Sequence, residues 1–188
     1  MLTAILTLFL IRGLPGSGKT STAGLLSSDA EYVGPKDFSD EDSFERTFHP
    51  VLEADAYFTT GDGVYHFDAS KLAEAHAWCQ AHTKKALGWP RPFSSISAND
   101  RIVFVTNTFS CRWEMEPYFR MAKDVGARVV VLDLFDGGLS DEELFERGTH
   151  DVPLHAIKAM RLRWEHNWRD GNPVAPWERS ANTTTLNS

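Results

Sequence analysis

Apolar runs recur along the chain at lengths that are typical of strands. They are bounded by turn or polar residues and lie at residues 3–11, 51–55, 101–106 and 128–135. The last two are apolar at successive positions rather than alternate ones, which is the pattern of strands covered on both faces. Amphipathic stretches separate the runs, and strands that alternate with helices favour a mostly parallel sheet between helical layers. The pattern therefore predicts an α/β fold, a three-layer sandwich.

Helices are expected where apolar residues recur at helical spacing and where capping residues mark an end. Asp68 or Ser70 can cap a helix that runs to about residue 87, and Gly126 closes a helix that begins near residue 113. Residues 140–143 have a capping-box sequence, and Pro153 suits the first turn of a final helix. The predicted helices lie at residues 21–26, 68–87, 113–125, 141–147 and 153–168.

Two polar stretches interrupt this alternation. Residues 28–50 form an acidic insertion without a sustained period, which is either functional or a solvated connection. This insertion could include a short helix at 40–48. Residues 171–188 are rich in Pro, Asn, Thr and Ser and are expected to form a flexible C-terminal tail. We therefore predict one domain over residues 1–170.

The length of 188 residues suits one domain with its own core. The formal net charge of -7 argues against a protein that coats nucleic acid by bulk electrostatics. The charge is concentrated, because residues 28–55 hold nine acids and only Lys36 and Arg46 as bases. The remainder of the chain is formally neutral and can still form a local basic groove.

Cys79 and Cys111 have no disulfide-scaffold spacing, which indicates reduced thiols in an intracellular, cytoplasmic protein. The apolar opening at residues 1–11 lacks the basic start and the small-residue cleavage site of a signal peptide. It leads directly into a glycine-rich loop, so we interpret it as a buried first strand. No apolar run reaches the length that spans a membrane, and no membrane partner is expected.

Residues 11–22 contain the spacing of a phosphate-binding loop. Gly13, four residues, then Gly18, Lys19 and Thr20 match the pattern, with an apolar run before the loop and a helix-forming segment after it. Glycines let consecutive backbone N–H groups turn toward one anion, and the helix N-terminus adds its positive end. Lys19 would neutralise the β- and γ-phosphates of ATP, and the Thr20 hydroxyl would ligate Mg²⁺. The expected nucleotide-binding residues are Gly13, Pro15, Gly16, Ser17, Gly18, Lys19, Thr20 and Ser21.

The phosphate loop, Asp55 and residues 106–108 all follow predicted strands. Ligands of parallel sheets bind at the carboxyl ends of the strands, so these segments should converge on one crevice. Asp55 is our candidate general base for an acceptor hydroxyl; an acid on a solvated strand end is the alternative. Asn107 or Thr108 could position Mg²⁺ or the acceptor. Asn107 occupies the place where a metal-binding acid is usual, and Asp133 is the other possibility, as a metal ligand or a structural acid.

Arg147 ends the helix predicted at 141–147, just before Gly148. A short helix with a glycine hinge is typical of a lid that brings an arginine to the γ-phosphate, so residues 140–153 form the predicted lid. A surface arginine is the alternative. His76 is a candidate contact for the acceptor, with a structural role in its helix as the alternative.

Further segments share an order with a known family. After the phosphate loop come residues 53–58 (EADAYF), 105–108 (VTNT) and 147–153 (RGTHDVP). In this order the chain resembles the polynucleotide-kinase-like P-loop kinases. Within that family it is most similar to the group typified by the kinase domain of NEDD4-binding protein 2, and the resemblance extends over about residues 5–168.

The resemblance implies an ATP- and Mg²⁺-dependent kinase that phosphorylates a hydroxyl of a nucleic acid. It places Asp55 at the position of the general base and Arg147 at that of the lid arginine. Two positions depart from the family. Kinases of 5′ ends have an arginine three residues after the base, where this chain has Phe58, which could stack on a base but cannot pair with a phosphate. The aspartate that follows the third strand in the family is Asn107 here.

These departures fit better with related phage-encoded kinases, which phosphorylate the hydroxymethyl group of 5-hydroxymethyluracil in DNA during thymidine hypermodification. We therefore expect this acceptor first, with DNA favoured over RNA and the host cytoplasm as the location of a phage-encoded protein. The alternatives are, in order, a polynucleotide 5′-hydroxyl kinase, a kinase of a free nucleoside or small alcohol, and a non-catalytic nucleotide-binding module. The oligomeric state stays open.

Overall fold

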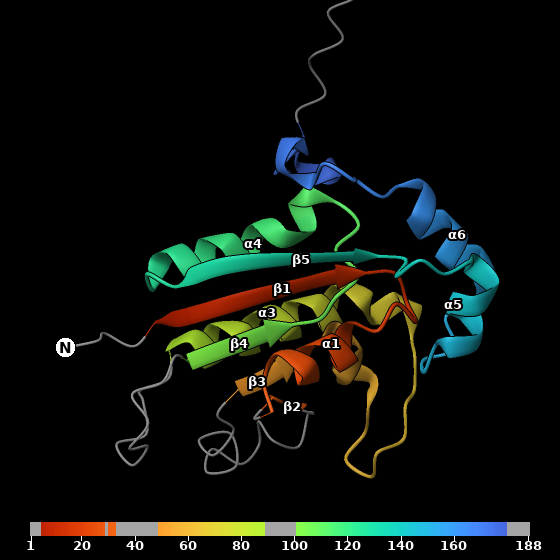
Figure 1. Cartoon of the computed structure of the whole chain (residues 1–188), viewed down its shortest axis with the longest axis horizontal. Helices are drawn as coiled ribbons and strands as arrows, with labels where there is room; N and C mark the ends of the chain where they lie inside the picture. The colour runs from red at the N-terminus through yellow and green to blue at the C-terminus, as the bar shows by residue number, and fades with distance from the viewer. Residues whose placement is uncertain (1–4, 29, 33–48, 89–100, 180–188) are drawn as a thin grey trace, which may run out of the picture.

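The computed structural model describes residues 5–28, 30–32, 49–88 and 101–179. At its centre lies a five-stranded sheet in the order β2-β3-β4-β1-β5, and every neighbouring pair of strands is parallel (Figure 1). The α/β fold predicted from the sequence is confirmed. The strands are β1 (Leu6–Gly13), β2 (Ala30–Tyr32), β3 (His49–Leu52), β4 (Arg101–Val105) and β5 (Arg128–Phe135).

Helices cover both faces of this sheet. Within the described ranges, none of them combines the length and the apolar character needed to cross a membrane. The α-helices are α1 (Lys19–Leu26), α3 (Leu72–Gly88), α4 (Arg112–Asp124), α5 (Asp141–Arg147) and α6 (Leu154–Leu162). Short 3₁₀ helices lie at η2 (Ala54–Phe58), η3 (Ala69–Lys71), η4 (Trp168–Asp170) and η5 (Pro176–Glu178).

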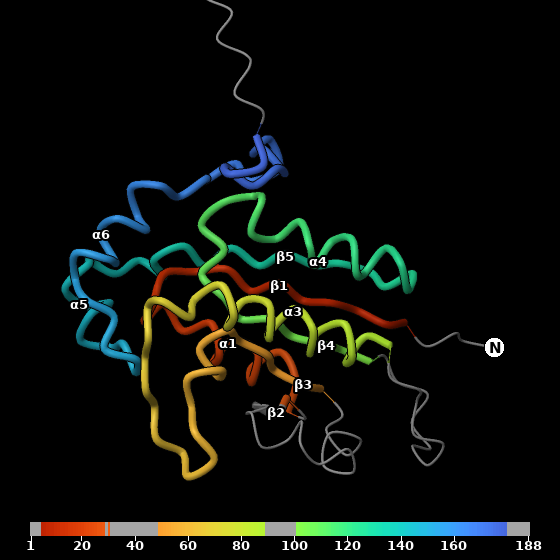
Figure 2. The backbone as a smooth tube through the Cα atoms, turned by 180° about the vertical axis from the view of Figure 1, so that it is seen from behind, coloured from red at the N-terminus to blue at the C-terminus, as the bar shows by residue number. Residues whose placement is uncertain are grey.

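The inner strand β1, between β4 and β5, supplies the core on both faces, because successive residues of a strand point to opposite sides. Ile11 packs with Ala23 of α1 on one face. Leu8 and Leu10 pack on the other face with buried residues of α3 and α4. Figure 1 shows the side with α1, and Figure 2 shows the opposite side with α3 and α4. The chain that leaves β1 at Gly13 therefore emerges between β4 and β5, at the carboxyl edge of the sheet.

The β5 strand has the bounds predicted from its apolar run, but its predicted burial is wrong. It lies at the edge of the sheet and pairs with β1 alone, so its side chains are only partly buried or exposed. Burial is most complete in β3, in β1 and in the carboxyl half of β4. A continuous apolar run thus does not separate a central strand from an edge strand.

Two other predicted boundaries are also wrong. The strand expected at residues 51–55 ends at Leu52, and Asp55 lies in the 3₁₀ helix η2. The final helix ends at Leu162 rather than near residue 168. It ends there because the next residues turn back toward the sheet, where the Glu165 N–H donates to the Ser110 carbonyl at 2.9 Å.

The two polar stretches of the sequence contain short secondary-structure elements that the hydrophobic pattern did not predict. The short strand β2 lies within the acidic insertion and pairs with β3; most of residues 28–50, including the helix expected at 40–48, lies outside the described residues. The first part of the predicted tail packs on α4, with Trp177 edge-on to Trp113. Residues 180–188 lie outside the described residues as well.

A fully buried arginine lies one residue before the end of β1, next to the phosphate loop. The Arg12 guanidinium forms an ion pair with Asp133 on β5 at 3.2 Å and donates to the carbonyls of Ser110 and Glu165. It also lies over the Trp164 ring, 4.0 Å from the ring centroid. Burial lowers the pKa of Arg12, and the Asp133 carboxylate opposes that effect. Asp133 therefore has the structural role that was considered for it beside that of a metal ligand, because it pairs with Arg12.

Replacing Arg12→Met should lower the free energy of unfolding by about 3–5 kcal/mol, because one partner of a buried charge network is lost. Urea denaturation followed by circular dichroism measures the change. The control is Arg120→Met on α4, whose side chain is 70% exposed and lies 3.8 Å from Glu116. That control should cost about 0–1 kcal/mol. Equal losses in the two variants would contradict the anchoring role of Arg12.

Candidate active site

A cleft of about 210 Å³ opens at the carboxyl edge of the sheet. Four segments line it: the loop between β1 and α1 with the first turn of α1, the residues that follow β3, the residues that follow β4, and residues 147–152. In the last segment Arg147 ends α5, and residues 148–152 form a strap after it. This is the crevice that the strand order predicts. The loop contributes Pro15, Gly16, Gly18, Lys19, Thr20 and Ser21, while Gly13 and Ser17 complete the loop behind this lining.

The loop has the backbone geometry of an anion cradle. Gly16 and Gly18 have φ angles of 79° and 90°, a region that favours glycine. The α1 helix begins at Lys19, so its positive N-terminal end faces the cleft. The Ser17 hydroxyl is buried and has no hydrogen-bond partner within the described residues. Turned amides, a helix N-terminus and an unpartnered donor together fit a phosphate group.

Lys19 is the cation of this cradle. Its Nζ donates to the Leu14 carbonyl at 3.2 Å. Burial lowers the pKa of Lys19, and the nearby Glu53 and Asp55 carboxylates oppose that effect. An ammonium beside two carboxylates in a partly closed cleft is suited to exchange its carbonyl contact for the phosphates of a nucleotide.

Glu53 follows β3 and connects three segments of the cleft. Its Oε2 atom accepts from the hydroxyls of Thr20 and Thr106, at 3.2 and 3.1 Å, and its Oε1 atom lies 3.7 Å from His150 Nε2. Burial alone would raise the pKa of Glu53, but His150, Thr106 and Lys19 outweigh it, so the pKa lies below its ordinary value. Glu53 is therefore held as a carboxylate.

The oxygen atoms of Glu53 and Thr20 fit Mg²⁺, which prefers a carboxylate with further hard oxygen ligands. They lie at hydrogen-bond distance from one another, beside the phosphate cradle. Sequence reasoning looked for this acid after β4 and missed Glu53. The signal that could have found it is its place directly after the apolar residues of β3, at the carboxyl edge of the sheet.

Asp55 lines the cleft from η2, close to the position expected for it. Burial raises the pKa of Asp55; His150, Lys19 and His76 oppose this shift, while Glu53 adds to it. The carboxylate therefore binds a proton more readily than an ordinary aspartate does. This property suits a group that must accept a proton.

His150 was not predicted as a site residue. It lies in the strap that follows α5, where its ring also packs on Tyr65, 4.5 Å between centroids. The ion pair with Glu53 raises the pKa of His150, against the effect of its own burial. It thus connects the strap with the carboxylate that faces Thr20. The sequence signal was its place in the RGTHDVP segment.

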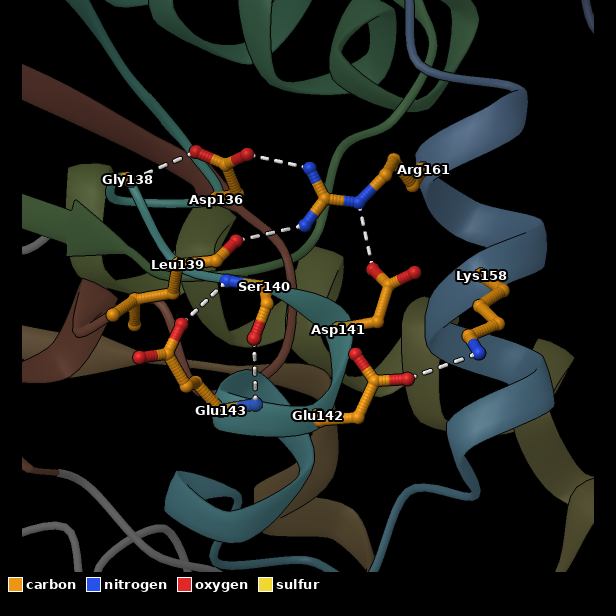
Figure 3. Close-up of polar contacts among 9 residues, drawn as sticks. All are labelled: Asp136, Gly138, Leu139, Ser140, Asp141, Glu142, Glu143, Lys158 and Arg161. Atoms are coloured by element: carbon orange, nitrogen blue, oxygen red, sulfur yellow. Dashed lines mark hydrogen bonds and ion pairs between the residues drawn. The ribbon is translucent and has the colours of Figure 1, made fainter.

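Arg147 ends α5 and lines the cleft, as expected for a lid arginine. Figure 3 shows how α5 is attached to α6. Arg161 of α6 forms ion pairs with Asp136 and with Asp141 of α5, and Lys158 of α6 pairs with Glu142 at 3.1 Å. The capping box at Ser140–Glu143 closes the first turn of α5.

The same helix also packs on the phosphate loop. Leu144 of α5 is fully buried with Leu14 and Ile157. A Cβ atom at Gly16 would overlap the Leu144 carbonyl oxygen. The position of Arg147 is therefore set by contacts with the phosphate loop itself.

Three residues predicted to bind the acceptor lie outside the cleft lining. Phe58 is 4% exposed and packs against Tyr65 and Phe67, so its ring is not free to stack on a base. Asn107 is 6% exposed and bonds to the backbone of Ala54. His76 is exposed on α3, near enough to Asp55 to influence its pKa. Thr108 is the predicted acceptor-side residue that does line the cleft.

Comparisons with known proteins agree with this architecture. No family model matches the chain. NEDD4-binding protein 2 from Homo sapiens is 34% identical over 156 residues, which make up 82% of this chain and 7% of that protein. The chain thus spans a small part of the length of this curated relative.

Two solved structures share the fold. A chain of the Pnkp1/Rnl/Hen1 RNA repair complex has a TM-score of 0.52 at 14% identity, over 86% of this chain and 45% of that one. Kti12 from Chaetomium thermophilum, in complex with ADP-AlF3, has a TM-score of 0.53 at 19% identity, over 90% and 84% of the two chains. The fold of the chain is that of the P-loop kinase-like proteins.

If Glu53 and Thr20 hold Mg²⁺, replacing Glu53→Gln should raise the Mg²⁺ concentration for half-maximal nucleotide binding about 10- to 100-fold, since a charged oxygen would be lost next to Thr20. Titration of Mg²⁺ at a fixed concentration of fluorescent ATP analogue measures the shift. The matched control is Glu178→Gln, an exposed glutamate in η5. A midpoint that is the same in both variants would argue against Glu53 as the metal-side carboxylate.

Proposed function

We propose that this chain is an ATP-dependent kinase that transfers the γ-phosphate to a hydroxyl of a nucleic acid. The observation that carries the proposal is one cleft that holds the phosphate loop, Glu53, Asp55 and Arg147. Phosphoryl transfer needs a phosphate cradle, a metal site, a group that takes the acceptor proton and a cation for the transferred group. The 34% identity with NEDD4-binding protein 2 and the kinase-like fold support the same assignment.

Each residue has a separate role in the proposed transfer. The loop amides and Lys19 bind the phosphates of ATP, and Thr20 with Glu53 would hold Mg²⁺, which offsets phosphate charge when bound. Asp55 accepts the proton of the acceptor hydroxyl. The acceptor oxygen then bonds to the γ-phosphorus as the bond from that phosphorus to the β–γ bridging oxygen breaks, which leaves ADP. Arg147 faces the transferred group and stabilises its charge.

As the acceptor we propose the 5-hydroxymethyl group of 5-hydroxymethyluracil in DNA. Among the described residues that line the cleft, one is a lysine, Lys19, and one is an arginine, Arg147. In the proposed transfer both of them bind the phosphates of the nucleotide. The residue three positions after Asp55 is Phe58, which is buried and uncharged. A terminal 5′-hydroxyl lies close to a backbone phosphate, which would need a cation beside Asp55. A hydroxymethyl group on a base reacts farther from the backbone, so the arrangement favours it.

The acceptor is tested with γ-labelled ATP and closed circular DNA. We expect label in circles that contain 5-hydroxymethyluracil and none in the same circles with thymine, because the hydroxymethyl group is the only difference between them. Label on linear DNA alone, removable by an end-specific phosphatase, would indicate a 5′-hydroxyl kinase. Label on free nucleosides alone would indicate a small-molecule kinase, and ATP binding without transfer to any acceptor would indicate a binding module. Each of these results contradicts the proposed acceptor.

Replacing Asp55→Asn should lower kcat about 10²- to 10⁴-fold, because the acceptor proton loses its base. The nucleotide Kd should stay within about 2-fold of the wild-type value, since Asp55 does not bind the nucleotide in this proposal.

Lys19→Ala should instead weaken nucleotide binding and lower turnover on the order of 10³-fold, because the phosphates lose their cation. Asp62→Asn, on the exposed turn after η2, is the control and should behave like wild type. Wild-type turnover in Asp55→Asn would contradict the base assignment.

A further inference from the structure

Asn107 lies at the end of β4, in the core beneath the cleft. Its Oδ1 atom accepts from the Ala54 N–H at 2.8 Å. Its Nδ2 atom is directed to two groups on α4 and α3, the Tyr118 hydroxyl at 3.4 Å and the Cys79 sulfur at 3.5 Å. Because a backbone N–H can only donate, the amide oxygen must face Ala54 and the amide nitrogen must face the two helices.

The partner of Asn107 is the first residue of η2, the element that carries Asp55. The first N–H groups of any helix have no acceptor within that helix. Ala54 is 6% exposed, and a buried N–H group needs an acceptor. Backbone bonds to the two flanking residues close the ends of η2, with Ala56 N–H donating to Glu53 O at 3.3 Å and Thr59 N–H to Ala56 O at 3.1 Å. The bond from Asn107 supplies the acceptor for the Ala54 N–H and connects the first residue of η2 with the segment that follows β4.

We propose that Asn107 is a positioning residue for Asp55. By binding the Ala54 N–H, it sets the direction in which the next side chain along the chain enters the cleft. The inference rests on the proposed function, because it assigns Asn107 a role in the same phosphoryl transfer. It replaces the acceptor or metal contact that the sequence suggested for this residue.

An amide suits this place better than the alternatives of similar size. A leucine would fill the space but leave the Ala54 N–H without an acceptor. An aspartate would keep the acceptor, but it has no donor for Tyr118 and would add a third carboxylate near Glu53 and Asp55. Burial raises the pKa of Cys79 to about 11 and that of Tyr118 well above its usual range, so the amide lies between neutral groups.

The contact itself is tested by amide hydrogen exchange at Ala54, which needs no enzymatic activity. We expect the Ala54 N–H to exchange at least about 10-fold faster in Asn107→Leu than in wild type. Asn107→Asp keeps an acceptor oxygen and should retain the protection. Cys79→Ala is the control, because it alters the same packing and leaves the Ala54 bond in place. Unchanged protection in Asn107→Leu would overturn the proposal.

The role in positioning is tested by a cycle of variants. Asn107→Leu should lower kcat about 10-fold or more and leave the nucleotide Kd within about 2-fold, while Cys79→Ala should keep kcat. If Asn107 acts through Asp55, adding Asn107→Leu to Asp55→Asn should change kcat by less than about 2-fold. Independent losses in the double variant, or wild-type kcat in Asn107→Leu, would overturn the assignment.

The two proposals fail in different ways. Wild-type protein that transfers phosphate to no acceptor would contradict the kinase function, and the exchange of Ala54 would then still report on the Asn107 contact. An active wild type with an equally active Asn107→Leu variant would contradict the positioning role alone. Asn107→Thr, whose hydroxyl is one bond shorter than the amide oxygen, takes the place of Asn107→Leu if the latter does not fold, with the same expected results.

Discussion

The buried guanidinium of Arg12 connects the parts of the chain from which the cleft is built. A charge in the core requires partners on several sides. Arg12 finds them on β5 at Asp133, in the connection after β4 at Ser110, and in the segment after α6 at Glu165. The next residue, Gly13, starts the phosphate loop. The end of β1 is therefore fixed against the segment that carries Thr108 on one side and the segment that follows α6 on the other.

Two carboxylates at the end of β3 show how one edge of a sheet can supply different chemistry. Glu53 and Asp55 are both largely buried, and burial raises the pKa of each. At Glu53 the contacts with His150 and Thr106 reverse this effect, while at Asp55 burial prevails. Pairs of titratable groups whose surroundings move their pKa values apart are typical of sites that separate a charged role from a proton-accepting role. Here the Glu53 carboxylate accepts from the Thr20 hydroxyl, while Asp55 lines the cleft from η2.

Much of the fold and the nucleotide side of the cleft could be predicted from the sequence, because both depend on local signals. Apolar runs marked four of the five strands, and the spacing of glycines with Lys19 and Thr20 marked the loop. The acceptor side depends on which way side chains point after a strand ends. Phe58 turns into the core because the chain enters η2 soon after β3, and Asn107 turns inward because it accepts a bond from the buried Ala54 N–H. Neither the 3₁₀ turn nor the contacts of Glu53 with Thr106 and His150 has a periodic signature.

The close approach of Gly16 to the Leu144 carbonyl has a consequence for how sequences of this kind can diverge. A side chain at position 16 would require α5 to move away, and α5 is held to α6 through Arg161 and Lys158. The overlap involves a backbone atom, which every residue at position 144 carries, so no side-chain substitution in α5 relieves it. A larger residue at position 16 would therefore be tolerated only with a displacement of α5, and Arg147 would move with that helix.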